Sequence, residues 1–339
     1  MKAKILISLV FAVLFTGCAP ENPSVPEKVE FFAMDTYMTI SAYGDHARDC
    51  LAEAQEKILT LDSLWSVSAA QSEISLLNKT GTAEVSPETL SIIKTAMQVS
   101  ADTEHTFDIT IYPLVKAWGF TTDTYRVPDE QELVNLKPLV NADRITLNEN
   151  TVTLETGMAL DLGAIAKGYA SEMAMDMLKA RGLSSAILSL GGNVQALGTK
   201  PDGSLWNVAI QDPKDLQAYA GAIQIADRAV ITSGTYQRYF EQDGIVYHHL
   251  LDPSTGKPAN NGLLSVTIVA DSGTRADALS TAMFVLGEEA AIDFWRSGLY
   301  EFDMILIAED GGMRITEGIK DTFVPSGDGA NLSVIARKS

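Results

Sequence analysis

The sequence has little cysteine and few basic residues. Its 339 residues include two cysteines, Cys18 and Cys50, which excludes a fold held together by several disulfides. Lys and Arg number 25 against 44 Asp and Glu, and the net charge of −19 argues against nucleic acid or an anionic membrane surface as a partner. After the N-terminus, no apolar run reaches the ~18 residues that a membrane-spanning helix needs. The length can bury one large core or two modest ones.

The N-terminus has the pattern of an export signal. Lys2 and Lys4 precede an apolar run over residues 5–15, and Gly17 and Cys18 follow it. We expect residues 1–17 to be a signal peptide similar to those of bacterial lipoproteins, with Cys18 cleaved and lipidated. The alternative is an ordinary secretory peptide in which Cys18 has no role. Residues 18–30, rich in proline, are then a tether on the outer side of a membrane, most simply the periplasmic side of the inner membrane, and residues 31–339 are the folded domain.

Alternating strands and helices with antiparallel hairpins indicate an α+β fold rather than a doubly wound parallel sheet. No low-complexity linker divides the chain, so we expect a single domain, built as one body or as two lobes. Cys50 falls in an amphipathic helix, where a buried thiol is the simplest interpretation. The main expected elements are a strand over 31–43, helices over 45–65, from Ser86-Pro87, over 163–181 and over 288–297, and hairpins within 144–155, 236–250 and 304–316.

Three oxygen-bearing side chains recur at helical spacing near residue 280. Asp277, Ser280 and Thr281 are three and four residues apart, so a helix places them on one face. A carboxylate with two hydroxyls suits Mg²⁺ better than Zn²⁺, above all when a phosphate completes the coordination. The alternative is a first helical turn in which Asp277 offsets the helix dipole and the hydroxyls bond to the backbone.

The segment from Asp161 to Gly168 combines a strand end, a glycine turn and a helix start. Free backbone N–H groups there, with Lys167 one turn into the helix, have the chemistry of a phosphate cradle. The spacing matches neither a Walker nor a dinucleotide-binding motif. A tight turn that needs glycine for steric reasons is an equal alternative.

Three weaker segments complete the set of candidates. Gly191-Gly192 is most simply a turn with positive φ angles, and Thr232-Ser233-Gly234 either bonds a ligand or starts a hairpin. His248 and His249 point to opposite faces of a strand, so they cannot both bind one metal from that geometry. One of them can face a cleft as a general base; the alternative is a structural histidine.

Together, segments in a fixed order resemble the FAD:protein FMN transferases of the ApbE type, from about Phe32 to Phe323. The resemblance implies an α+β domain with mixed and antiparallel sheets, flanking helices and, if there are two lobes, a flavin cleft between them. The segments are Met34–Thr36, Phe107–Thr110 leading to Pro113–Phe120, Asp161–Gly168, Leu190–Asn193, Thr232–Gly234, His249–Gly256 and Ala276–Gly287.

The resemblance also implies an activity. Such an enzyme binds FAD and Mg²⁺, moves FMN onto a Thr or Ser hydroxyl of a flavoprotein, and releases AMP. The implied Mg²⁺ ligands are the carbonyl of Ala164 with Asp277 and Thr281. Ser280, which stands where some members have Asp, is a further candidate. The implied FAD contacts, some through backbone atoms, are Met34, Thr106, Phe107, Asp108, Asp161, Lys167 and Leu251.

For catalysis, we hypothesise that His249 is the base for the acceptor hydroxyl, oriented by Asp252, and that Asp277 acts through the metal. Ser68 replaces a Tyr that some members place over the flavin. Expected acceptors are flavoproteins outside the cytoplasm, such as subunits of membrane redox complexes. Two rival functions remain open on sequence alone: a Mg²⁺-dependent FAD pyrophosphatase that yields free FMN, and a non-catalytic flavin-binding lipoprotein.

Overall fold

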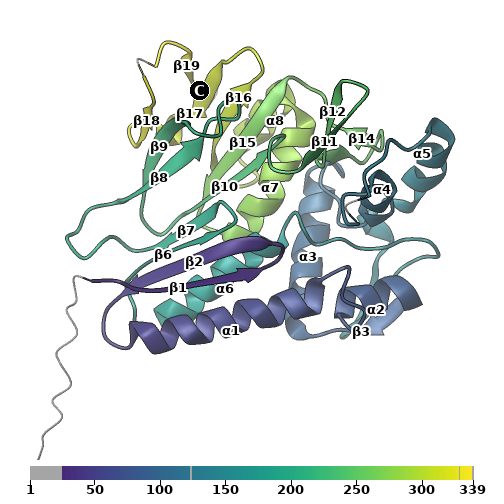
Figure 1. Cartoon of the computed structure of the whole chain (residues 1–339), viewed down its shortest axis with the longest axis horizontal. Coiled ribbons are helices and arrows are strands. Elements are labelled where there is room, and N and C mark those ends of the chain that lie inside the picture. The colour runs from purple at the N-terminus through teal and green to yellow at the C-terminus, as the bar shows by residue number, and fades with distance from the viewer. Residues whose placement is uncertain (1–24, 123, 328, 338–339) are drawn as a thin grey trace, which may run out of the picture.

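The computed structural model describes residues 25–122, 124–327 and 329–337 (Figure 1). The expected signal peptide, Cys18 and most of the tether therefore lie outside the described residues. In the described part, a nine-stranded sheet forms the centre of one α+β domain, with the fold class as expected from the sequence. Its strands, in order across the sheet, are β1 (Glu27–Ala33), β2 (Thr36–Tyr43), β6 (Ser185–Leu190), β7 (Asn193–Leu197), β10 (Ala229–Gly234), β15 (Leu263–Ala270), β16 (Asp303–Ala308), β17 (Met313–Thr316) and β19 (Leu332–Ile335).

Neighbouring strands of this sheet are antiparallel except β17 and β19, which run parallel. The smaller sheets are β3 (Thr82–Glu84), β5 (Thr151–Thr153) and β4 (Thr146–Asn148); β18 (Phe323–Pro325), β9 (Tyr219–Ile225) and β8 (Trp206–Gln211); β11 (Tyr239–Gln242) with β12 (Ile245–His248); and β13 (Leu251–Asp252) with β14 (Lys257–Pro258). The helices are α1 (Ala47–Trp65), α2 (Glu73–Thr80), α3 (Pro87–Asp102), α4 (Tyr112–Trp118), α5 (Glu130–Leu136), α6 (Ala166–Ala180), α7 (Gly273–Leu286) and α8 (Glu288–Ser297), with 3₁₀ turns at Lys137–Leu139, Ala142–Arg144 and Glu317–Ile319.

The central sheet is covered on both faces. Helices α1, α6 and α7 lie on one face, and the β18-β9-β8 sheet covers part of the other (Figure 1). Consecutive residues of β10 enter different cores, since Ile231 packs with the helices and Val230 with the small sheet. Burial on both faces explains why the first half of this strand, Ala229–Ile231, is apolar without alternation.

Several predicted elements are confirmed. Ser86 caps α3 by accepting a hydrogen bond from the backbone N–H of Thr89 at 3.2 Å, and Pro87 is its first residue. Gly182 follows α6 with a φ of 86°, the left-handed conformation typical of helix ends. Cys50 is a free, buried thiol in α1. The three predicted hairpins appear as β4–β5, β11–β12 and β16–β17.

The single strand expected over residues 31–43 is wrong. The chain forms two antiparallel strands, β1 and β2, joined by a turn at Met34 and Asp35, whose φ angles are 48° and 57°. Neither residue is glycine or asparagine, so the sequence carries only the weak turn signal of Asp35 there. Strand β1 starts at Glu27, and the folded part therefore begins before residue 31, inside the expected tether.

Within the described ranges, no helix is both long and apolar enough to cross a membrane.

Candidate active site

Helices α6 and α7 approach each other closely at two glycines. A Cβ on Gly168 would lie 2.2 Å from the carbonyl oxygen of Gly273 and 2.5 Å from the Cβ of Asp277. A Cβ on Gly273 would lie 2.4 Å from Oε1 of Gln195. Only glycine fits these positions without moving the helices apart. This contact brings the carboxylate of Asp277 to the N-terminal end of α6.

Asp277 binds two donors from other elements. Its Oδ2 accepts a hydrogen bond from the backbone N–H of Gly168 at 2.8 Å, and its Oδ1 accepts one from Nδ2 of Asn193 at 3.0 Å. Gly168 is the third residue of α6, so its N–H has no partner within its own helix. Asp277 itself is 5% exposed. Asp277 lies in the second turn of α7, whose N-cap is Ser272, so the interpretation as a first-turn dipole cap of its own helix is wrong.

The predicted common face of Ser280 and Thr281 is confirmed by a shared neighbour. Oγ of Ser233 lies 2.7 Å from Oγ of Ser280 and 3.2 Å from Oγ1 of Thr281. Ser280 is fully buried, and its hydroxyl donates to the carbonyl of Asp277 at 2.8 Å. Thr281 is partly exposed and has no such backbone bond. Thr281 is therefore the better placed of the two hydroxyls to bind a ligand.

Ala164 lies just before α6. At the start of the helix, Ala166 N–H donates to the carbonyl of Leu162 at 2.8 Å and Tyr169 N–H to that of Ile165 at 3.0 Å, while Gly168 N–H, four positions after Ala164, donates to Asp277. The carbonyl of Ala164 therefore accepts none of these bonds. The donor set of a carboxylate, a hydroxyl and a carbonyl is the oxygen chemistry that Mg²⁺ prefers. No cluster of three or more His, Cys, Asp or Glu able to hold a metal occurs in the part of the chain described.

The loop before α6 carries charges that act on one another. Asp161 is half-buried, and its Oδ1 accepts a bond from Gly163 N–H at 2.8 Å. Burial raises the pKa of Asp161, while the bond from Gly163 and the positive charges of Arg238 and Lys167 oppose that rise. The negative charge of Asp35, in the β1–β2 turn, also raises the pKa of Asp161. This turn and the loop are therefore neighbours, which is what the prediction that Met34, Asp161 and Lys167 contact one ligand requires.

His249 lies directly after β12 and is half-buried. Its Nδ1 is 3.1 Å from the carbonyl oxygen of Arg238, and its backbone N–H donates to the same oxygen at 3.0 Å. A carbonyl oxygen only accepts, so Nδ1 carries the proton and Nε2 keeps a lone pair. Burial, assisted by the charge of Arg238, lowers the pKa of His249 to about 3. The imidazole is therefore neutral at physiological pH and has an accepting nitrogen, as a general base needs.

One expectation for this region needs correction. Asp252 does not orient His249: its Oδ1 accepts from Ser254 N–H at 2.8 Å in the turn that joins β13 to β14. The carbonyl of Arg238 supplies the orientation instead. His248 is structural, because it is 8% exposed, has Nε2 3.1 Å from the carbonyl of Ala259, and meets the ring of Phe284 edge-on.

The segment Thr106–Asp108 has a strong structural role. Asp108 is buried, and its carboxylate accepts bonds from Thr110 N–H at 2.7 Å and from Ala142 N–H at 2.8 Å. Phe107 is buried in the main core, and the backbone N–H of Asp161 donates to Ile109 at 2.8 Å. The segment thus fixes the loop that bears Asp161. The Asp108 side chain is already engaged, so the predicted FAD contact at this residue would have to come from its backbone.

The remaining predicted residues lie at different depths. Leu251 is buried in an aromatic cluster with Leu114 and Trp118. Ser68 is exposed in the turn after α1, with its Oγ 3.1 Å from that of Ser66. Gly191 and Gly192 have φ angles of 60° and 93° in the β6–β7 turn, which confirms the simple interpretation. Ser233 of the Thr232–Gly234 segment turns inward to α7.

Sequence reasoning missed Arg238, and it named Asn193 only as the end of the Leu190–Asn193 segment, without its contact to Asp277. Arg238 precedes β11; its Nη1 donates to the carbonyl of Phe120 at 3.3 Å, and its charge acts on both Asp161 and His249. Asn193 orients Asp277 from the end of the Gly191-Gly192 turn. The only available signal was their position beside motifs, since neither belongs to a recognisable spacing of its own.

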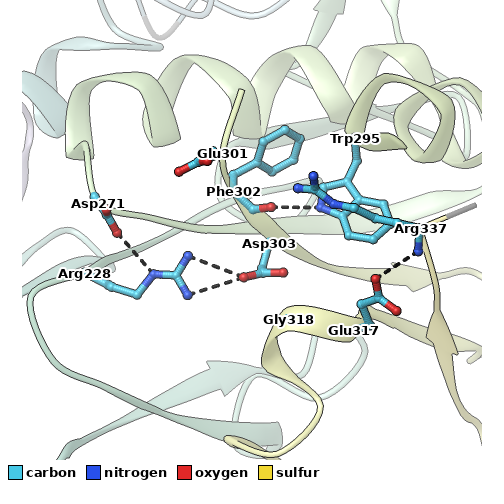
Figure 2. Close-up of a pocket in the computed structure, with 9 residues that line it drawn as sticks. All are labelled: Arg228, Asp271, Trp295, Glu301, Phe302, Asp303, Glu317, Gly318 and Arg337. Atoms are coloured by element: carbon cyan, nitrogen blue, oxygen red, sulfur yellow. Dashed lines mark hydrogen bonds and ion pairs between the residues drawn. The ribbon is translucent and has the colours of Figure 1, made fainter. Parts of the chain in front are cut away.

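A pocket of about 270 Å³ lies elsewhere, around an ion pair between Arg228 and Asp303 with an Nη1–Oδ2 distance of 3.3 Å (Figure 2). Asp303 also accepts from Oγ1 of Thr316 at 2.9 Å, and the indole N–H of Trp295 donates to Phe302 at 2.8 Å. None of the predicted site residues lines it. Its polar groups hold the end of the sheet together, so we assign it a structural role.

Comparisons with known proteins cover most of the chain. The sequence matches the ApbE family over residues 34–306. It is 31% identical over 318 residues to a protein of Vibrio cholerae named FAD:protein FMN transferase, covering 90% of this chain and 94% of the relative.

Two solved structures superpose on most of this chain. The apbe protein of Thermotoga maritima superposes with a TM-score of 0.81 at 32% identity, covering 87% of this chain and 98% of that one. The flavinyl transferase ApbE of Pseudomonas stutzeri in its apo form superposes with a TM-score of 0.79 at 28% identity, covering 88% and 97%.

Proposed function

This chain belongs to the ApbE family and is an FAD:protein FMN transferase, and we propose that its reaction depends on Mg²⁺ held by Asp277, Thr281 and the carbonyl of Ala164. The enzyme transfers FMN from FAD to target proteins. The observation that supports the metal site best is the carboxylate of Asp277 at the N-terminal end of α6, bonded to Gly168 N–H. A carboxylate there keeps further lone pairs for a cation beside N–H groups that suit phosphate.

Ser280 contributes to this proposal indirectly. Its hydroxyl is engaged with Ser233 and with the carbonyl of Asp277, so we assign it to the support of α7 rather than to the metal. Mg²⁺ bound there would neutralise negative charge on the pyrophosphate and orient the phosphorus for in-line attack. Lys167 and Arg238 add positive charge on the side of the loop that bears Asp161.

His249 is the proposed base. Its Nε2 takes the proton of a Thr or Ser hydroxyl of the acceptor, and the acceptor oxygen forms a bond to the phosphorus of the FMN half. The anhydride bond between the two phosphates breaks, and AMP leaves. The carbonyl of Arg238 holds the ring in the tautomer that leaves Nε2 free to accept.

The metal proposal is tested by titrating Mg²⁺ into wild type and Asp277→Asn while AMP release from FAD and acceptor is followed. Asn keeps the shape but removes the charge, so we expect the Mg²⁺ concentration for half-maximal rate to rise about tenfold or more. Asp176→Asn, at an exposed position of α6, is the matched control and is expected to behave as wild type. Equal Mg²⁺ dependence of wild type and Asp277→Asn rejects the assignment.

We also propose that the enzyme works outside the cytoplasm, anchored through a lipid on Cys18. The apolar run, Gly17 and Cys18 support this placement, and so does the short stretch between Cys18 and the start of β1 at Glu27. Acceptors are then exported flavoproteins or the exported parts of membrane redox complexes.

A further inference from the structure

The β11–β12 hairpin carries an exposed apolar surface. Tyr239, Ile245 and Val246 are 51%, 55% and 54% exposed, and we call these three residues the hairpin patch. Because side chains alternate along a strand, Tyr239 and Val246 lie on one face of the hairpin and Ile245 on the other, so the hairpin patch extends over both faces. The hairpin projects at the upper right of the molecule, beside α4 and α5 (Figure 1). Exposed apolar side chains gathered on one element are typical of surfaces that bind another protein.

The hairpin is held in place by aromatic contacts on one face. Phe240 and Tyr247 are cross-strand partners, and their rings stack with centroids 5.3 Å apart. Tyr247 also packs against Trp118 at 5.4 Å, and Phe240 stacks on Tyr125 at 5.2 Å. The hairpin patch is therefore presented from a fixed support rather than from a mobile loop.

The base of the hairpin is part of the active site. Arg238 immediately precedes β11 and His249 immediately follows β12, and the two are joined at 3.0 and 3.1 Å. Each strand has four residues, so the free end lies roughly 13 Å from His249 at the usual rise of about 3.3 Å per residue. A molecule that binds the hairpin patch therefore reaches the proposed base.

We propose that the hairpin patch is the docking surface for the acceptor flavoprotein, which lays an extended segment along the hairpin and so delivers its Thr or Ser hydroxyl to His249. This inference rests on the proposed function. Target proteins are the second substrate of the enzyme, and they must reach His249 while FAD occupies the site. The base of the hairpin packs on the body, where His248 meets Phe284, so the approach is from the free end of the hairpin.

The backbone and the charge of the hairpin indicate the chemistry of the docking segment. The sheet has only two strands within the described residues, so each strand has an outer edge to which an extended segment can add. Glu241 and Asp243 are exposed beside the hairpin patch, on a chain of net charge −19. We therefore expect a segment that combines apolar with Lys or Arg residues.

The test measures KM for the acceptor protein in wild type, Val246→Ser, Ile245→Ser and the double variant. The acceptor is a protein substrate of the Vibrio cholerae relative, chosen because wild type labels it with FMN. Val324→Ser is the matched control, since Val324 is also a strand residue and is 63% exposed, but lies on β18. FAD affinity in the presence of Mg²⁺ is measured for every variant to show that the site remains folded.

We expect each hairpin substitution to raise KM for the acceptor about tenfold, because truncating a buried apolar anchor at an interface has an effect of this size. FAD affinity and kcat should stay at wild-type values, and Val324→Ser should change none of them. An unchanged KM in the double variant overturns the proposal, as does a fall in kcat alone, which would place the effect on His249. Failure of wild type to label any acceptor counts against the proposed function itself.

Discussion

The imidazole of His249 is fixed by one backbone oxygen. The Arg238 carbonyl takes the Nδ1 proton, and the ring, half-buried beside the Arg238 and Lys167 charges, has its pKa lowered to about 3. A base with so low a pKa is neutral throughout the physiological range and keeps Nε2 ready to accept. Its proton affinity rises only when negative charge, such as a bound pyrophosphate, enters the site.

This predicts an unusual pH profile. The neutral form is the active base, so lowering the pH removes activity only as it approaches the folded-state pKa of about 3. We expect kcat/KM for FAD, measured at saturating acceptor, to show no histidine step between pH 8 and about pH 5, because kcat/KM reports the free enzyme.

The companion variant is His249→Ala, which should lower kcat about 100-fold or more, as expected for loss of a general base, while FAD still binds. A wild-type profile with a midpoint near the usual histidine pKa of about 6.5 that disappears in His249→Ala would contradict the account.

Sequence reasoning reached some of these residues and not others. The spacings of three and four residues from Asp277 to Ser280 and Thr281 predicted a shared helix face, because a helix repeats every 3.6 residues. They could not separate the roles of Ser280 and Thr281, since the contact of both with Ser233 depends on how α7 packs on β10. The contact of Asn193 with Asp277 was missed for the same reason, because it spans 84 positions of sequence.

At the scale of elements, the pair α6 and α7 builds the site. Gly168 and Gly273 allow the two helices to pack in direct contact, and this contact places Asp277 at the start of α6. Hairpins with glycine in their turns, such as β11–β12, were predictable from sequence. The β1–β2 turn was not, because Met34 adopts a positive φ angle that its side chain does not favour, and no glycine is present.

Gly168→Ala tests the role of the helix contact. At an ordinary helical position this change stabilises by about 1 kcal/mol, because glycine is a poor helix former. Here the new Cβ would lie 2.2 Å from Gly273 O, and we expect the free energy of unfolding to fall by about 1–3 kcal/mol, as overpacking does.

The control for this change is Asp176→Ala, at an exposed position of the same helix, which should leave stability unchanged or slightly raised. Denaturant unfolding followed by circular dichroism measures both. A stabilised Gly168→Ala variant with full transferase activity would show that α6 and α7 do not need this contact.

At the scale of the whole molecule, a single domain carries the site, and the sequence predicts that a tether joins this domain to a membrane anchor. The described residues hold no helix able to span a membrane, and the proposed anchor is the lipid on Cys18. The α+β class was predictable from alternating strand and helix patterns. The order of strands in the nine-stranded sheet was not, since pairings such as β2 with β6 join distant segments.

Cys18→Ser tests the anchor. Without a thiol to acylate, the protein should move from the membrane fraction to the soluble fraction of the exporting cell, because stable anchoring depends on attached lipid chains. Cys50→Ser, which removes the other cysteine, serves as the control and should leave the protein in the membrane fraction. Retention of Cys18→Ser in the membrane would reject lipidation at this residue.

The central claim is that the FMN released from FAD passes to a protein hydroxyl and not to water. The most direct measurement follows AMP, free FMN and acceptor mass together in one reaction with FAD, Mg²⁺ and a Thr-bearing acceptor. The account predicts that labelled acceptor and AMP form in equal amounts with little free FMN. Equal amounts of AMP and free FMN with an unmodified acceptor would contradict it.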